Sequence, residues 1–225
     1  MHSIILTTFL CCSTQSKSVQ EQYIEALHLA DQDPTKGLEK CAELTDQALK
    51  QDCQMAAIEK LAKHNPQRIK DHCPTLSGVA ISECYFIAAE ISKDPSDCEK
   101  TSEFSLDCKL HLLSQNLLKV KNINPSTKIL QEFHLPEDST EGWTAIFRIH
   151  HMKQRILDLQ WCETVPKSQL CRKAGMGLFH ERLNIARDKG SFSCTAKDHS
   201  KHLRYVPDQE IESALQQRKQ QELCP

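Results

Sequence analysis

Cysteine is the residue type in this chain with the clearest potential for chemistry, since 12 of the 225 residues are cysteines. Eight of them form four consecutive pairs: Cys41 and Cys53, Cys73 and Cys84, Cys98 and Cys108, and Cys162 and Cys171. A zinc site usually takes two thiolates from one tight C-x2–4-C turn, and a redox-active dithiol takes them from C-x-x-C. Eight to eleven residues intervene within the pairs here, which excludes both kinds of site for them.

The spacing suits a disulfide bond between two antiparallel helices that are joined by a short turn. Such helices pack about 8 to 10 Å apart, which brings small side chains within disulfide reach. We expect each pair to form one bond across a helical hairpin. Cys194 and Cys224 remain as partners for a fifth bond, which would hold the last helix against the rest of the chain.

The first 20 residues resemble a secretory leader. An apolar run from Ile4 to Leu10 precedes Cys11, Cys12 and a polar stretch, and the run is too short to span a bilayer. A cysteine directly after such a run also resembles a bacterial lipoprotein signal, with Cys11 as the lipidated residue and the only membrane attachment. A buried first helix is the alternative. Because disulfides persist in oxidising compartments, we expect an exported protein of the periplasm or outer envelope.

An internal repeat places the cysteine pairs on helices. Pro34, Pro66 and Pro95 each follow Asp or Asn, and the intervals between them are 32 and 29 residues. Each step comes after an apolar helical segment and before a cysteine pair. An Asp-Pro or Asn-Pro step ends one helix and can open the next. A period near 30 residues is typical of stacked helical pairs.

This repeat resembles the helical hairpins of tetratricopeptide-type proteins over residues 22 to 120. The resemblance implies a concave surface that binds a protein or a peptide. The segment ECYFIAAE, from Glu83 to Glu90, is similar to one in cysteine-paired exported bacterial proteins of no established activity. A competing interpretation is the twin C-x9-C fold of the mitochondrial intermembrane space. Only Cys98 and Cys108 have that spacing, and that fold predicts a different connectivity.

Composition favours an all-α fold, since glycine is scarce, at 6 residues, and good helix formers dominate. We predict stacked, disulfide-stapled hairpins of α-solenoid type with a diverged helical C-terminal half. The expected parts are a leader and tether (1–20), hairpin repeats (21–121), a linker (122–141) and a helical C-terminal subdomain (142–225). In the last part the pattern predicts helices over 143–161, 175–187 and 208–223.

Histidine is the second candidate for chemistry, with five residues in the C-terminal subdomain (142–225): His150, His151, His180, His199 and His202. A metal site would need three or four ligands gathered in space, and no H-E-x-x-H motif is present. Glu141 beside Trp143 could act as a general acid in a glycan-cleaving site, although a glutamate at a helix start beside a core tryptophan explains the same residues. No metal ligand set or cofactor is predicted.

Two functional hypotheses follow. The leading one is a non-catalytic, exported helical-repeat protein that binds a protein or peptide partner or acts as a structural scaffold. The alternative is an envelope hydrolase or metal-dependent enzyme with its site in the histidine-rich half. Nucleic-acid binding is not expected, because a net charge of −2 and 12 aromatic residues do not supply a phosphate-neutralising surface.

Overall fold

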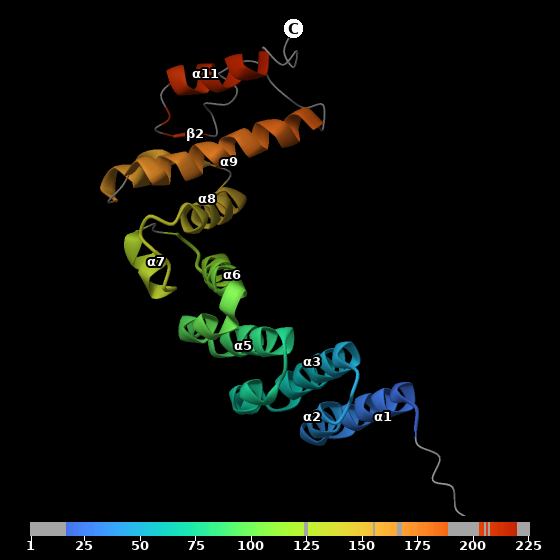
Figure 1. Ribbon diagram of the computed structural model, residues 1–225. Helices are drawn as coiled ribbons and strands as arrows, with labels where there is room; N and C mark the ends of the chain where they lie inside the picture. The colour runs from blue at the N-terminus through green and yellow to red at the C-terminus, as the bar shows by residue number, and fades with distance from the viewer. Residues whose placement is uncertain are drawn as a thin grey trace, which may run out of the picture. The chain divides into compact units, whose positions relative to one another are not determined.

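A computed structural model describes residues 17–123, 126–154, 156–165, 168–188, 203–204, 206 and 208–219. This part of the chain is mostly helical, as the composition predicts. In chain order the elements are α1 (Val19–Gln32), α2 (Pro34–Ala42), α3 (Gln47–His64), η1 (Pro66–Arg68), α4 (Ile69–His72), η2 (Cys73–Thr75), α5 (Val79–Ser92), η3 (Pro95–Phe104), α6 (Ser105–Lys119), α7 (Thr127–Glu132), α8 (Thr140–Gln154), β1 (Leu157–Asp158), η4 (Leu159–Thr164), α9 (Ser168–Asp188), β2 (Leu203–Arg204) and α11 (Asp208–Lys219), where η marks 3-10 helix (Figure 1).

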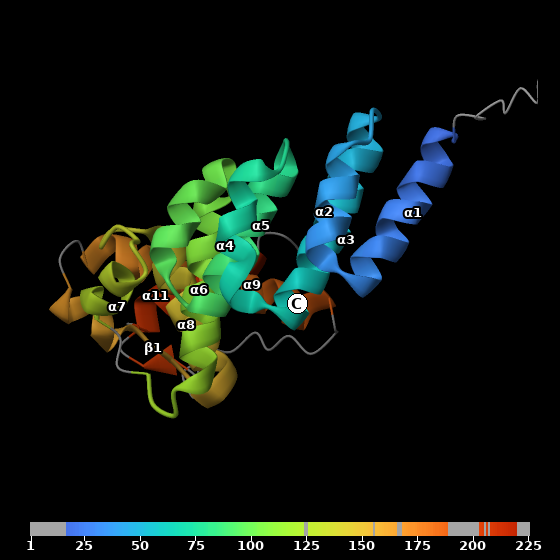
Figure 2. The ribbon, with the colours of Figure 1, turned by 90° about the horizontal axis from the view of Figure 1, so that it is seen from below.

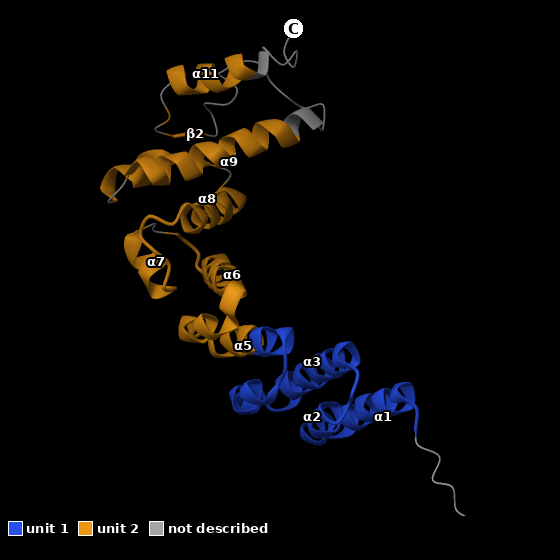
Figure 3. Cartoon of the chain, viewed as in Figure 1, with its two compact units in different colours: residues 1–84 blue, residues 85–225 orange. Residues whose placement is uncertain are grey.

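The chain divides into two compact units, residues 1–84 and 85–225, with the division inside α5 (Figure 3). The segment 122–141, for which the sequence predicts a linker, lies within the second unit. It contributes α7 and the buried side chains of Leu130, Phe133 and Leu135 to the core of that unit. Within the described residues, no helix is both long enough and apolar enough to cross a membrane.

In the first unit, α1 and α3 lie side by side and run in the same direction, with α2 packed against both (Figure 2). The Tyr23 hydroxyl donates to the Asp52 carboxylate near the starts of the two helices. Near their ends, Asp31 forms an ion pair with Lys60 at 2.6 Å. Both contacts join residues 29 positions apart, so the sequence repeat corresponds to a spatial repeat of long helices with a short return helix between them.

The Asp-Pro and Asn-Pro steps end one helix and open the next. Asp33 caps α2 by accepting a hydrogen bond from the backbone N–H of Lys36 at 3.2 Å, and Pro34 is the first residue of that helix. Asp94 accepts from the N–H of Ser96 at 2.9 Å and opens η3 in the same way. The cap satisfies a backbone donor that has no partner within the helix, and proline fits the first turn because it lacks that donor.

In the second unit a small parallel β-ribbon interrupts the helical pattern. β1 pairs with β2 through Leu157 and Leu203. The helix predicted over 143–161 therefore ends earlier, at Gln154. Leu157 and Leu159 are both buried at alternate positions, a spacing that suits extended chain as well as a helix. The prediction of an all-α chain is thus right for the bulk of the described residues and wrong at these two strands.

Candidate functional site

The structure contains four disulfides with the pairing that the spacing predicts: Cys41–Cys53, Cys73–Cys84, Cys98–Cys108 and Cys162–Cys171. Their Cα–Cα distances are 5.4 to 5.5 Å, which is ordinary for a disulfide. All eight cysteines are fully buried. Because an attacking thiolate must reach a sulfur atom, buried bonds of this kind are structural and not catalytic.

Each disulfide joins a short helical element to the first two turns of the long helix that follows. Only Cys41–Cys53 joins two α-helices, α2 and α3. In the other three pairs the first cysteine lies in a 3-10 helix, in η2, η3 or η4. The prediction of a disulfide between two helices is therefore confirmed in all four copies, and in these three the first helix is of 3-10 type at its cysteine.

A second periodic signal shows that the fourth copy belongs to the same pattern. Asp158 opens η4 by accepting from the backbone N–H of Gln160 at 3.0 Å, without a proline. The third residue after the first cysteine is buried in every copy, at Leu44, Leu76, Thr101 and Val165. The position is apolar in three copies and threonine in the third, and its C-x-x spacing from the cysteine is visible in the sequence and would have aligned the fourth copy with the others.

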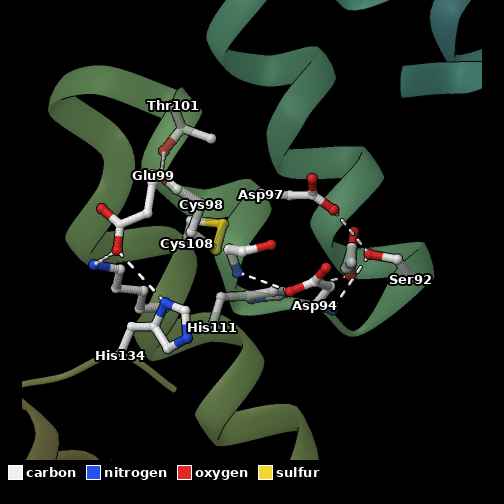
Figure 4. The surroundings of a disulfide bond; sticks show 12 residues. Ser92, Asp94, Asp97, Cys98, Glu99, Thr101, Cys108, His111 and His134 are labelled. Carbon is white, nitrogen blue, oxygen red and sulfur yellow. Dashed lines mark hydrogen bonds and ion pairs between the residues drawn. A yellow bond between two sulfur atoms is a disulfide. The ribbon is translucent and has the colours of Figure 1, made fainter. Parts of the chain in front are cut away.

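Polar groups around the Cys98–Cys108 bond pair with one another (Figure 4). The Thr101 hydroxyl donates to the Cys98 carbonyl at 2.8 Å, and the Ser92 hydroxyl donates to the buried Asp97 carboxylate at 3.1 Å. Glu99 lies 2.6 Å from Nζ of Lys109, and this hydrogen bond lowers the pKa of the Glu99 carboxyl. These contacts stabilise the joint between η3 and α6.

The histidines of the C-terminal half serve packing where the structure describes them. The His150 ring meets Trp161 edge-on with ring centres 4.2 Å apart, and its Nδ1 lies 3.2 Å from the Ile156 carbonyl. Burial lowers the pKa of His150. His151 is buried beside Arg182. Within the described ranges, no three His, Cys, Asp or Glu side chains are grouped so that they could hold a metal ion.

The Glu141 and Trp143 pair does not form a glycan-cleaving site. Trp143 is fully buried, and its Nε1 donates to the Glu137 carbonyl at 3.0 Å, so the ring is a core residue. Glu141 is exposed in the first turn of α8. The remaining predicted residues, Cys11, Cys12, Cys194, His199, His202 and Cys224, lie outside the described residues. Lipidation of Cys11 and the Cys194–Cys224 bond therefore stay predictions.

Among the described residues, a groove of about 510 Å³ lies between α6 and α8, inside the second unit. Its lining residues are Asp107, Leu110, His111 and Ser114 on α6, and Thr140, Glu141, Thr144, Ala145, Arg148 and Ile149 on α8. On each helix these residues are three or four positions apart, so each helix presents one continuous face. The two helices run in the same direction, because residues from both first turns meet in the groove and Lys153, at the end of α8, donates to the Leu117 carbonyl at 2.7 Å.

Apolar side chains line this groove together with charged and polar groups. Leu110, Ala145 and Ile149 pack against or belong to the hydrophobic core. Because the core fixes these residues, the groove is held open by the fold and needs no rearrangement to accept a ligand.

Both basic groups of the groove are already paired with carboxylates of the same unit. Arg148 lies 2.8 Å from Glu181 of α9. His111 Nε2 lies 2.9 Å from Glu90, which also accepts from the Gln115 amide at 2.6 Å. The hydrogen bond from His111 lowers the pKa of Glu90. The position of the His111 side chain is therefore tied to α5 and is not set by the groove alone.

The serine and the histidine of the groove are not joined as a nucleophile and base. Ser114 follows His111 by three positions, but no hydrogen bond joins the two side chains in the structure, whereas an activated hydroxyl needs a base within about 3 Å. Of the groove residues, only Glu141 is a candidate functional residue from the sequence alone. The others could be recognised only once α6 and α8 were known to pack side by side.

The sequence matches no protein-family model, and no curated protein and no solved structure shows significant similarity to it. The four intramolecular disulfides indicate an oxidising environment, as outside the cell or in an exported compartment.

Proposed function

We propose that this protein is a non-catalytic scaffold of the cell envelope that binds a protein or peptide partner in the groove between α6 and α8. The observation that carries the proposal is the groove itself, which is preformed by two core-packed helices and combines apolar with polar side chains. Sites of this composition hold ligands by shape and by a few oriented polar contacts.

The repeat supports the same proposal. In the first unit, α1 and α3 run parallel with a register of 29 residues, and in the second unit α6 and α8 also run parallel. Parallel long helices with short return elements are the arrangement of α-solenoid repeats, which present extended binding faces. We extend this to a solenoid-like stack of tetratricopeptide type, each copy stapled by one disulfide. Export with a lipid anchor at Cys11 would place that stack at the periplasmic or outer face of an envelope.

A groove-filling variant tests the proposal in the protein's own cell. Ser114→Trp places a large ring in the groove, and Asn116→Trp places the same ring on the exposed side of the same helix. Full-length protein with each change is purified under mild conditions, and co-purifying proteins are quantified by mass spectrometry. The proposal expects a partner that is lost with Ser114→Trp and kept with Asn116→Trp. A partner set that is identical for both variants would overturn it.

A further inference from the structure

The unpaired charges of the groove point to the chemical class of its partner. Asp107 and Glu141 both line the groove, one in the first turn of α6 and the other in the first turn of α8. Neither carboxylate has a cation within ion-pair distance in the part of the chain that the structure describes. The only hydrogen bond that Glu141 accepts is a long one from the Ser139 hydroxyl, at 3.3 Å. The groove therefore has one end at which negative charge lacks a protein counter-charge.

The basic side chains along the same groove, in contrast, already have carboxylate partners. Arg148 forms an ion pair with Glu181, and His111 is hydrogen-bonded to Glu90, so both side chains already have a carboxylate partner and offer an incoming anion little. The positive ends of the two helix dipoles stabilise the nearby carboxylates of Asp107 and Glu141 by only about 0.3 to 1 kcal/mol. The oxygen atoms of these carboxylates can still accept a charge-assisted hydrogen bond from a ligand. The negative charge of the groove that lacks a counter-charge therefore favours a cationic group on the ligand.

The apolar side chains of the groove indicate which other groups the ligand must carry besides that cation. Glu141, Ala145 and Ile149 follow one another at intervals of four residues on α8, which spaces them about 6 Å apart along the helix. A ligand that places a cation at Glu141 therefore meets apolar surface about 6 and 12 Å further along. A free amine does not extend that far, whereas a peptide segment does, because alternate residues of an extended chain are about 6.6 Å apart.

We infer that the groove takes a basic and apolar segment of a partner protein, with a Lys or Arg side chain between Asp107 and Glu141 and apolar side chains over Leu110, Ala145 and Ile149. This inference rests on the proposed function and adds the partner's chemistry. The basic residue of the segment lies at the N-terminal ends of α6 and α8, and its apolar residues lie further along the two helices. Acidic segments are disfavoured because they would meet two unpaired carboxylates at that end.

Selection from a displayed library of random linear peptides tests the inference on the full-length, oxidised protein. We expect the selected peptides to combine Lys or Arg with aliphatic or aromatic residues. Their binding should weaken about tenfold in Asp107→Asn with Glu141→Gln, as loss of charge-assisted hydrogen bonds predicts. It should also weaken as ionic strength rises. Glu212→Gln, which removes an exposed carboxylate of α11 in the same unit, outside the groove, should change the affinity less than about twofold, as expected for a solvent-screened charge that does not line the groove.

The outcomes separate this inference from the proposed function. Acidic or uncharged peptides whose binding is blocked by Ser114→Trp, but is insensitive to the carboxylate changes, would overturn the inference and leave the groove as a binding site. Peptides that bind equally well to Ser114→Trp, or no selected peptide at all, would overturn both. Loss of binding in the double amide variant together with a lowered melting temperature would be resolved by Asp107→Asn and Glu141→Gln alone, each of which should weaken binding without unfolding the chain.

Discussion

The carboxylate of Glu90 lies 2.9 Å from Nε2 of His111, and this contact joins α5 to the helix that forms one wall of the groove. The His111 ring also packs against Phe86 with ring centres 5.4 Å apart. A polar contact with Glu90 and an aromatic contact with Phe86, both on α5, thus fix the side chain of His111. The position of a groove residue is therefore set by a neighbouring helix that does not line the groove.

The Glu90 contact predicts a specific acid dependence of stability. Its hydrogen bonds lower the pKa of Glu90 in the folded protein, so ionised Glu90 stabilises the fold above the ordinary glutamate pKa of about 4.3. That contribution is lost as the pH falls through the lowered folded-state pKa. Because both side chains are about 40 % exposed, Glu90→Gln should cost less than about 1 kcal/mol at pH 5.5.

Urea unfolding of wild type and Glu90→Gln across the acid range measures this. The difference in unfolding free energy between the two should shrink as the pH is lowered from 5.5 toward 3. Glu132→Gln is a matched control, because Glu132 is exposed on α7 of the same unit and makes no ion pair in the structure. A difference between wild type and Glu90→Gln that stays constant with pH would contradict the assignment.

Removal of one buried disulfide should lower the thermal stability of the protein. The Cys73–Cys84 bond closes a loop with a sequence separation of 11, and closing such a loop stabilises a fold by about 2 to 3 kcal/mol through the unfolded chain. Cys73→Ala with Cys84→Ala should therefore lower the melting temperature in oxidising buffer clearly more than Ser96→Ala does. Ser96 is exposed and its hydroxyl makes no contact. Equal melting temperatures for the two variants would refute a structural role for the bond.

The Asp-Pro step at Asp33 should behave as a helix cap. Asp33→Ala removes the acceptor of the Lys36 N–H hydrogen bond, and loss of such a cap typically costs about 1 kcal/mol. Asp33→Asn keeps an acceptor in place and should restore most of that stability. Thermal unfolding followed by circular dichroism compares the three proteins. If Asp33→Asn were as unstable as Asp33→Ala, the ion pair with Lys36 at 3.1 Å would be the larger contribution.

Two helical glycines should respond to alanine in opposite ways. A Cβ at Gly37 would lie 2.4 Å from Cα of Ala30, because α1 and α2 approach most closely there. Gly37→Ala should therefore destabilise by about 1 to 3 kcal/mol through overpacking. At Gly177 on α9 an added Cβ meets nothing within 4 Å, so Gly177→Ala should stabilise by up to about 1 kcal/mol through helix propensity. Equal effects of the two changes on the melting temperature would contradict the close approach of α1 and α2.

Local features of the fold are predictable from the sequence because short-range chemistry determines them. The four disulfides and the Asp33, Asn65 and Asp94 steps follow from spacing, since a helix end and a hairpin bond involve residues close along the chain. The β-ribbon is not predictable in this way, because Leu157 pairs with a residue 46 positions later. The groove is not predictable from the sequence either, because α7 and the segments around it lie between α6 and α8 along the chain. The sequence pattern of α6 does not reveal that its Asp107–Ser114 face meets α8.

Photo-crosslinking from inside the groove tests the scaffold proposal most directly. A photoreactive amino acid is placed at Ser114, which lines the groove, and in parallel at Asn116 on the exposed side of α6. Each full-length protein is expressed in its native cell, illuminated and digested, and the crosslinked peptides are sequenced. The account predicts one dominant adduct from position 114, to a segment that carries Lys or Arg beside apolar residues, and none of that species from position 116. The same adducts from both positions, or none from position 114, would contradict it.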